Sequence, residues 1–180
     1  GIKFKELIVA NDALTVVVHK ENTWADCLTT AQLKKVWEPN SKVNNWNQVR
    51  PSFPDRELHL YGAGTDSGTY DYFTAAVIGE EGASRTNYQA SEDDNVLVQG
   101  VSGDKGGLGY FGYAYYAENM DKLKVLKVAG VEPTHDTIAD GTYAPLSRPI
   151  FIYVKASSLE KPQVKAFVDF YLSNPAVTGD

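Results

Sequence analysis

Apolar and polar positions follow two different periods along the chain, and this pattern predicts strands alternating with helices. Short runs of branched apolar residues are typical of buried strands. Two such runs, ELIVA and ALTVVVH, open the chain and are separated by Asn11 and Asp12. Further strands are expected in ELHLYG, GGLGYFG, KLKVLKVAG and PIFIYVK. Because strands and helices alternate over most of the chain, we expect a three-layer α/β domain.

Helix signals lie between these strands. The segment TAQLKKVWEP has apolar residues at helical spacing, a threonine cap in front and Pro39 behind it. The segment TYDYFTAAVIG has an apolar helical face and ends at Gly79. Ser91, followed three residues later by Asp94, predicts a capping-box start for a helix over about 92–100. The segment KPQVKAFVDFYLS predicts a helix whose inward face contains Val164, Phe167, Val168 and Tyr171.

A glycine-rich turn, GAGTDSGTYDYF, joins an expected strand to an expected helix. Such a turn directs several backbone N–H groups toward one point, where the helix dipole adds partial positive charge. Gly64 permits a tight turn, and Gly68 lets a ligand approach the main chain. The hydroxyls of Thr65, Ser67 and Thr69 are additional short donors. The turn therefore suits a small oxyanion.

The same turn has other interpretations. In a structural one, Ser67 or Thr65 caps the helix and the glycines only turn the chain. In a catalytic one, Ser67 attacks a phosphate ester, but the G-x-S-x-G motif is absent and the three histidines show no triad signature. The nucleotide-binding glycine motifs are absent too. A binding protein, a phosphate-ester hydrolase and a structural or interaction domain stay open at this point.

Composition narrows the class of protein. The 180 residues are 43% hydrophobic, which fits one soluble globular domain, and the apolar runs are too short to span a membrane. The net charge is −6 and the basic residues are scattered, so we expect no nucleic-acid partner. The single cysteine, Cys27, excludes an internal disulfide framework. Without metal-ligand spacing we expect no metal and no cofactor, and the acids of SEDDN are expected to cap a helix and line a solvated face.

Six segments together resemble the PstS-type phosphate-binding proteins of phosphate ABC transporters, in their cyanobacterial-type branch. They are NDALTVVV, CLTTAQLKKVWEP, LYGAGTDSGTYDYF, SEDDNVLVQGV, LGYFGYAYY and DGTYAPLSRPIFIYV, and they stand in the family's order over nearly the whole chain. The resemblance implies a type II periplasmic-binding-protein-like lobe with a mixed sheet in three α/β/α layers. It implies a non-catalytic protein that binds inorganic phosphate and works with ABC transporter permease subunits.

The resemblance also implies how the chain relates to a complete receptor. Residues 1–180 would be mostly the second of two lobes, with first-lobe segments before Gly1 and after Asp180 missing. The amino terminus shows no signal-peptide pattern. A periplasmic or cell-surface location therefore follows only from the family, whose export signal would lie upstream of Gly1.

The family's phosphate-binding Ser-Gly-Thr falls on Ser67, Gly68 and Thr69, and Thr65 adds a donor beside them. In the family, the aspartate that accepts the proton of phosphate comes chiefly from the other lobe. Asp66, beside the loop, is a candidate to assist in binding, and a favourable interaction of its negative charge with the helix N-terminus explains the residue equally well.

The resemblance also implies an arginine in the site. In the better-known branch of the family it lies four residues before the serine, but here that position is Ala63. Arg85, in GASRTNY, is the candidate substitute because a guanidinium can donate to two phosphate oxygens. Arg148, in PLSRP, is a second candidate whose role is expected to be structural.

Overall fold

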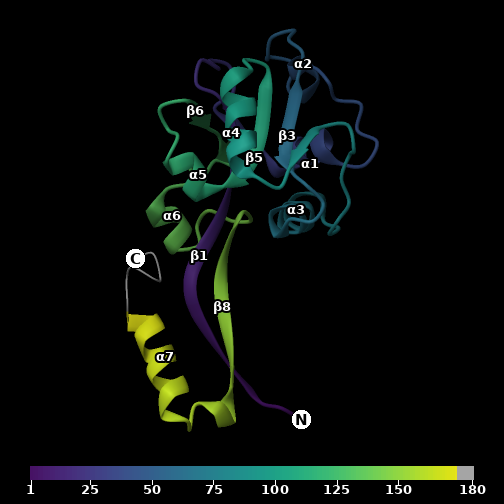
Figure 1. Ribbon diagram of the computed structural model, residues 1–180. Helices are drawn as coiled ribbons and strands as arrows, with labels where there is room; N and C mark the ends of the chain where they lie inside the picture. The colour runs from purple at the N-terminus through teal and green to yellow at the C-terminus, as the bar shows by residue number, and fades with distance from the viewer. Residues whose placement is uncertain (174–180) are drawn as a thin grey trace. The chain divides into compact units, whose positions relative to one another are not determined.

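The computed structural model describes residues 1–173, and these residues form two compact units (Figure 1). The first unit contains residues 1–12 together with the described residues from Arg148 onward. The second unit, Ala13–Ser147, contains the glycine-rich turn.

The second unit contains most of the secondary structure. Its strands are β1 (Phe4–His19, which begins in the first unit), β2 (Cys27–Leu28), β3 (His59–Ala63), β4 (Gln89–Ser91), β5 (Gly107–Gly112), β6 (Leu123–Val125) and β7 (Lys127–Val128). Its helices are α1 (Thr30–Trp37), α2 (Trp46–Val49), α3 (Gly68–Phe73), the π-helix η1 (Thr74–Ile78), α4 (Asp94–Gly103), α5 (Tyr113–Ala117) and α6 (His135–Ala139).

The main sheet is mixed, as the resemblance implied. Its strand order is β4-β3-β5-β1-β6. Strand β3 runs parallel to both β4 and β5, whereas β1 runs antiparallel to β5 and β6. Strands β2 and β7 form a separate parallel pair. Because β3 and β4 are parallel, the segments that follow them leave the sheet at the same edge.

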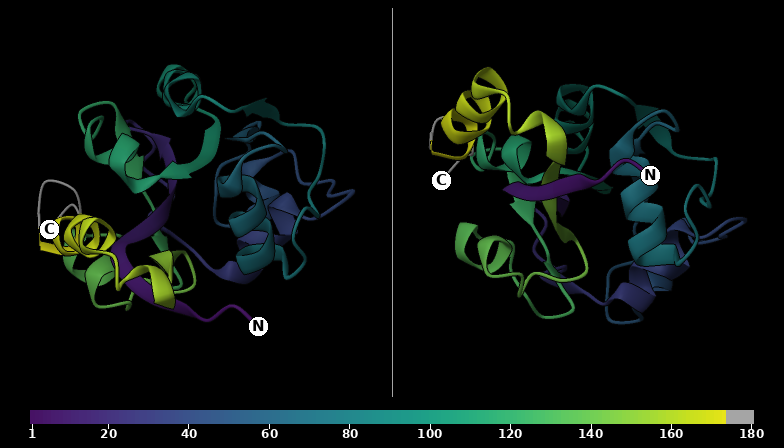
Figure 2. Two further views of the ribbon diagram at one scale, coloured as in Figure 1. Left: turned by 60° about the horizontal axis from the view of Figure 1, so that its bottom comes forward. Right: turned by 90° about the horizontal axis from the view of Figure 1, so that it is seen from below.

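Helices cover both faces of this sheet, which confirms the three-layer prediction. Alternating residues of a strand point to opposite faces. Val16 and Val18 belong to one buried cluster with residues of α1, α2 and α3, whereas Val17 belongs to a second cluster with residues of α4 and α5. Figures 1 and 2 show α4 on one side of the sheet and α1 and α3 on the other.

The first unit combines the start of β1 with β8 (Ser147–Lys155), the 3-10 turn η2 (Ala156–Ser158) and α7 (Pro162–Ser173). Strand β8 pairs with β1, and Ala156 N–H donates to the carbonyl of Lys3 at 2.9 Å. Val168 of α7 is buried. None of the helices within residues 1–173 is long and apolar enough to cross a membrane.

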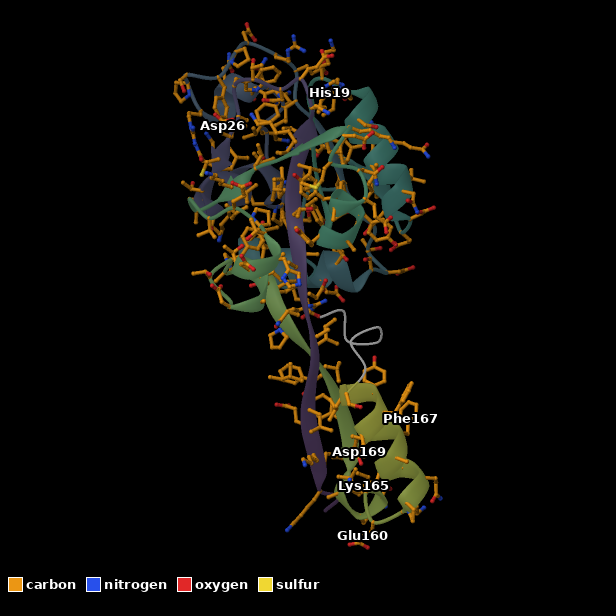
Figure 3. The ribbon with its side chains drawn as sticks, turned by 90° about the vertical axis from the view of Figure 1, so that its left-hand side faces the viewer. His19, Asp26, Glu160, Lys165, Phe167 and Asp169 are labelled. Carbon is orange, nitrogen blue, oxygen red and sulfur yellow. The ribbon has the colours of Figure 1, made fainter. Side chains whose placement is uncertain are left out.

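The prediction for the inward face of α7 is wrong at Phe167, which is 64% exposed. Figure 3 shows Phe167 on the side of α7 that faces away from β1 and β8. Neighbouring helical residues point about 100° apart, so burial of Val168 turns Phe167 out. Phe4 and Ile8 of β1 and Tyr153 of β8 are exposed as well.

Three further expectations need correction. Asn11 and Asp12 do not separate two strands, because β1 continues through them where it passes from one unit to the other. The segment KLKVLKVAG is not one strand, since its two halves join different sheets on either side of the buried Leu126. Helix α4 is capped by Asp93 instead of Ser91, because Ser91 is still paired with Ala63 in the sheet.

Local signals that lie within one segment are confirmed. Thr29 and Gln32 form a reciprocal capping box at the start of α1, and Pro39 follows the helix. Gly79 ends η1 with a φ of 90°, a left-handed conformation that glycine adopts without steric cost. The predicted strand, turn and helix around Ser67 are β3, the glycine-rich turn and α3.

Candidate functional site

The glycine-rich turn, residues 64–69, includes the first two residues of α3 and lies at the ends of β3 and β4. Gly64 N–H donates to the carbonyl of Ser91, which ties the turn to the end of β4 at 3.1 Å. Ser67 N–H donates to the carbonyl of Gly64, also at 3.1 Å, and closes the turn. Strand β3 ends at the buried Ala63 immediately before it. The position of the turn therefore follows from the sheet.

Ser67 is the N-cap of α3. Its Oγ accepts a hydrogen bond from Thr69 N–H at 3.1 Å, so the structural interpretation of the turn is confirmed for this residue. A capping hydroxyl uses an oxygen lone pair and keeps its own proton for a second partner. Capping and anion binding are therefore compatible at Ser67.

Several donors at the turn have no acceptor within residues 1–173. They are the N–H groups of Thr65 and Gly68 and the hydroxyls of Thr65, Ser67 and Thr69. A Cβ added at Gly68 would meet nothing within 4 Å, so the main chain is open to an approaching group there. Thr65 and Asp66 are exposed, and Ser67 and Thr69 are half-buried. The turn thus presents donors from main chain and side chains in one short segment.

Glu92 contributes a carboxylate to this site that the sequence did not reveal. Its Oε1 accepts a hydrogen bond from Asp66 N–H at 3.3 Å. It also lies so close to Gly64 that an added Cβ would be 2.0 Å from the same oxygen. The prediction that the SEDDN acids cap a helix and line a solvated face is confirmed, since Asp93 caps α4 and Glu92 is exposed; the hydrogen bond of Glu92 to the turn is an additional finding. The only signal for Glu92 was its place directly after β4, whose end is level with the end of β3.

Tyr88 stabilises the end of β3, just before the turn. Its hydroxyl donates to the carbonyl of Ala63 at 2.8 Å. Burial, together with neighbouring Tyr70 and Glu92, raises the pKa of Tyr88 to about 12. The phenol is therefore protonated at neutral pH and acts as a donor that fixes the backbone just before the turn.

The structure does not bring Arg85 to the turn. Arg85 precedes β4, whereas the turn follows β3, and these strands are parallel with Tyr61 opposite Gln89. The two segments therefore lie at opposite ends of the strand pair. Two hollows lined by Arg85 contain no residue of the turn. Its role in gripping an anion at the turn stays a prediction without support from this geometry.

Arg148 lies in the first unit, on β8. Its Nε is 3.5 Å from Oδ2 of Asp12, an ion pair between two neighbouring strands of that unit. This contact agrees with the structural role expected for Arg148.

A separate group of titratable side chains surrounds Asp104, after the end of α4. Its Oδ2 is 2.6 Å from Nδ1 of His59 and accepts from the hydroxyl of Tyr61 at 2.9 Å. Its Oδ1 accepts from Gly106 N–H at 2.8 Å. The carboxylate thus links the start of β3 to the loop before β5. No group of three or more His, Cys, Asp or Glu within residues 1–173 is arranged to hold a metal ion.

We expect Asp104→Asn to lower the pKa of His59. Burial alone would lower this pKa, but the hydrogen bond and charge of Asp104, helped by Glu57, raise it above 6.5 overall. Because the pKa of His59 is higher in the folded than in the unfolded protein, protonation of His59 stabilises the fold. This stabilisation is fully present below the pKa of the unfolded protein and is lost as the pH rises through the pKa of the folded protein. NMR titration of the His59 ring in both proteins measures the effect. An unchanged pKa would contradict it.

The chain is similar to known proteins over nearly its whole length. A family model described as PBP superfamily domain matches residues 1–175. Protein SphX of Synechocystis sp. is 47% identical over 184 residues, which cover 98% of this chain and 55% of that protein. Phosphate-binding protein PstS of Staphylococcus haemolyticus is 40% identical over 179 residues, which cover 96% of this chain and 55% of the relative.

A solved structure agrees with these matches. The crystal structure of a possible phosphate binding protein from Planctomyces limnophilus superposes with a TM-score of 0.88 and is 50% identical. The match covers 98% of this chain and 64% of that one. This chain therefore spans about half the length of the curated relatives it matches.

Proposed function

Because this chain belongs to the PBP superfamily, as the match over residues 1–175 shows, we propose that it is part of a receptor that binds inorganic phosphate. The observation that carries this proposal is the set of open donors at Ser67, Gly68 and Thr69, at the start of α3. We take the anion from two similar proteins, the phosphate-binding protein PstS of Staphylococcus haemolyticus and the possible phosphate binding protein of Planctomyces limnophilus. We propose that the receptor serves an ABC phosphate importer and works with its permease subunits, in the periplasm or at the cell surface.

Each residue of the turn has a separate proposed role. The Gly68 N–H and the Ser67 and Thr69 hydroxyls donate to phosphate oxygens, and Thr65 adds donors at the exposed edge. Asp66 supplies its N–H to Glu92 and so fixes that carboxylate beside the turn.

We further propose that the second unit, Ala13–Ser147, is most of the second lobe of a two-lobed protein, whose remaining first-lobe segments lie outside this sequence.

The proposed role is non-catalytic. Ser67 Oγ is engaged with Thr69 N–H, and within residues 1–173 it has no hydrogen bond to a histidine or carboxylate that could act as a base. A Ser67→Ala protein that retained turnover of a chromogenic phosphate ester, equal to that of the parent, would exclude Ser67 as a nucleophile. No turnover in either protein is the expected result.

An amide NMR titration of the chain with phosphate, and then with sulfate at equal ionic strength, tests the binding proposal. We expect the amides of Ser67, Gly68 and Thr69 to shift with phosphate and to shift less with sulfate. Chemical-shift changes of the amides are detectable even when the chain binds phosphate weakly. If these amides do not move with phosphate, the turn alone does not bind it.

We expect Glu92→Gln to reduce the preference for phosphate over sulfate by about tenfold, equivalent to about 1.4 kcal/mol. Hydrogen phosphate can donate a proton to the Glu92 carboxylate, whereas sulfate at neutral pH has no proton to donate and is repelled. The ratio of the two dissociation constants is measured in the same titration. Glu80→Gln, an equal charge change at another exposed position, is the control. An unchanged ratio would remove Glu92 from the site.

A further inference from the structure

Arg85 is a buried cation without a carboxylate partner. Its residue surface is 5% exposed, and none of the ion pairs of residues 1–173 involves it. An arginine stays protonated in proteins even where burial lowers its pKa, as it does here. A buried charge is costly unless other groups compensate it. Its compensation within the chain must therefore come from neutral acceptors.

Those acceptors occupy one side of the guanidinium. Nη1 donates to the carbonyls of Val36 and Val43 at 3.0 and 2.7 Å, and Nε donates to Oδ1 of Asn87 at 2.8 Å. Val36 lies in the last turn of α1, where the helix dipole favours a cation. Nη2 makes no hydrogen bond within residues 1–173. Arg85 thus has a structural side and an unused side.

Arg85 lines a polar hollow of about 290 Å³. Lys42 lines the same hollow, is exposed, and forms neither an ion pair nor a hydrogen bond within the described residues. No acidic side chain lines it, although Glu57 lines the neighbouring hollow that shares Arg85. The remaining lining residues are neutral and polar: Asn40, Ser41, Asn44, Thr86 and Asn87.

We propose that this hollow is a second anion site, separate from the turn, and that it takes a tetrahedral oxyanion. Two positively charged residues, Lys42 and Arg85, line a polar hollow that no acidic residue lines, and asparagine and threonine side chains can supply further donors. Because Nε and Nη1 are already engaged, Arg85 cannot offer the two-pronged fork that matches a planar carboxylate. Single donors from several directions suit phosphate or sulfate instead.

The proposal is independent of phosphate binding at the turn. The turn lies where β3 ends, whereas the hollow lies beside the residues that precede β4. Their amide signals can therefore be followed separately in one experiment. The hollow provides no carboxylate to accept a proton, so this site is expected to bind sulfate about as well as phosphate.

The test is an NMR titration of the chain with phosphate, sulfate and acetate, each compared with sodium chloride at equal ionic strength. We expect saturable shifts at the amides of Lys42, Thr86 and Asn87 and at Arg85 Nε–H with phosphate and sulfate. Acetate and chloride should produce much smaller shifts. Equal saturation by acetate would overturn the tetrahedral assignment, and the absence of shifts with phosphate and sulfate would overturn the site.

Three variants sharpen this test. Lys42→Gln removes an exposed cation without touching the core and should weaken binding of both oxyanions at the hollow at least about fivefold. Lys155→Gln changes the net charge equally on β8 of the first unit and should leave the dissociation constants unchanged. Arg85→Lys should abolish the saturable shifts, with thermal unfolding recorded in parallel. Retained affinity in Lys42→Gln would contradict the proposal whether or not Arg85→Lys folds.

Discussion

Replacement of Trp37 by alanine is expected to lower the free energy of unfolding by about 3 to 5 kcal/mol, the largest effect of any change considered. Trp37 is 1% exposed at the end of α1. Its ring meets those of Phe73, Tyr88 and Tyr110 edge-on, with centroid distances of 5.6, 5.4 and 4.9 Å. The substitution leaves a cavity and removes these aromatic contacts together.

The same cluster connects the core to the candidate site. Phe73 lies at the end of α3 and stacks on Tyr110 of β5 with a centroid distance of 3.7 Å. Tyr88 holds the carbonyl of Ala63 just before the turn. Loss of Trp37 should therefore also broaden or shift the amide signals of residues 64–69, although none of these residues is changed.

Urea unfolding followed by the fluorescence of Trp24 and Trp46 measures this effect, because both tryptophans remain in the variant. Met120→Ala is the control, since Met120 is 57% exposed and a surface substitution is expected to change stability by less than about 0.5 kcal/mol. Trp37→Phe should destabilise less than Trp37→Ala because it leaves a smaller cavity. A loss below about 1 kcal/mol for Trp37→Ala would mean that the cluster relaxes around the missing ring.

The sequence alone predicts an element correctly where that element depends only on residues close by along the chain. The capping box of Thr29 and Gln32 joins residues only three positions apart, and Gly79 needs no distant partner to adopt its left-handed conformation. The strand, turn and helix around Ser67 lie within one continuous segment. Apolar periodicity and glycine position carry enough information for such elements.

The sequence alone does not predict the contacts of a side chain whose partners lie in distant segments of the chain. Arg85 donates to carbonyls 49 and 42 residues away, and no local pattern reveals that its guanidinium is used there instead of at the turn. Glu92 reaches Asp66 across 26 residues because β3 and β4 are neighbours in the sheet. Phe167 was predicted to be buried from helical spacing alone, and spacing does not say which apolar residue faces the strands.

The candidate site was predicted in part from the sequence and in part only from the structure. Sequence pattern and resemblance located the turn, and the structure supplies its open donors and the carboxylate beside it. Ala63 occupies the position where the family's arginine was expected, and it is buried and apolar. The donors at the turn are therefore hydroxyls and backbone amides, so each of them should carry a measurable share of the binding energy.

In the full-length protein, with the segments that the relatives have beyond this chain restored, Ser67→Ala and Thr69→Ala should each weaken phosphate binding by roughly 1 to 3 kcal/mol. Each change leaves a charged acceptor without one donor. The two variants differ in stability, however, because Ser67 also caps α3. Ser67→Ala should cost a further 0.5 to 2 kcal/mol of folding free energy, roughly the value of an N-cap, whereas Thr69→Ala should be nearly neutral.

Calorimetric titration with phosphate, combined with thermal unfolding of the ligand-free proteins, separates these two effects. Ser67→Gly removes the hydroxyl but costs only a few tenths of a kcal/mol as a cap, so it should weaken binding about as much as Ser67→Ala with less loss of stability. Ser52→Ala, at an exposed serine outside the turn, is the control and should change neither quantity. If Ser67→Ala loses stability while both Ser67→Ala and Thr69→Ala keep their affinity for phosphate, the turn is only a helix cap and the anion binds elsewhere. If affinity falls in Thr69→Ala while stability is unchanged, the hydroxyl acts on the ligand, because it has no hydrogen-bond partner within residues 1–173.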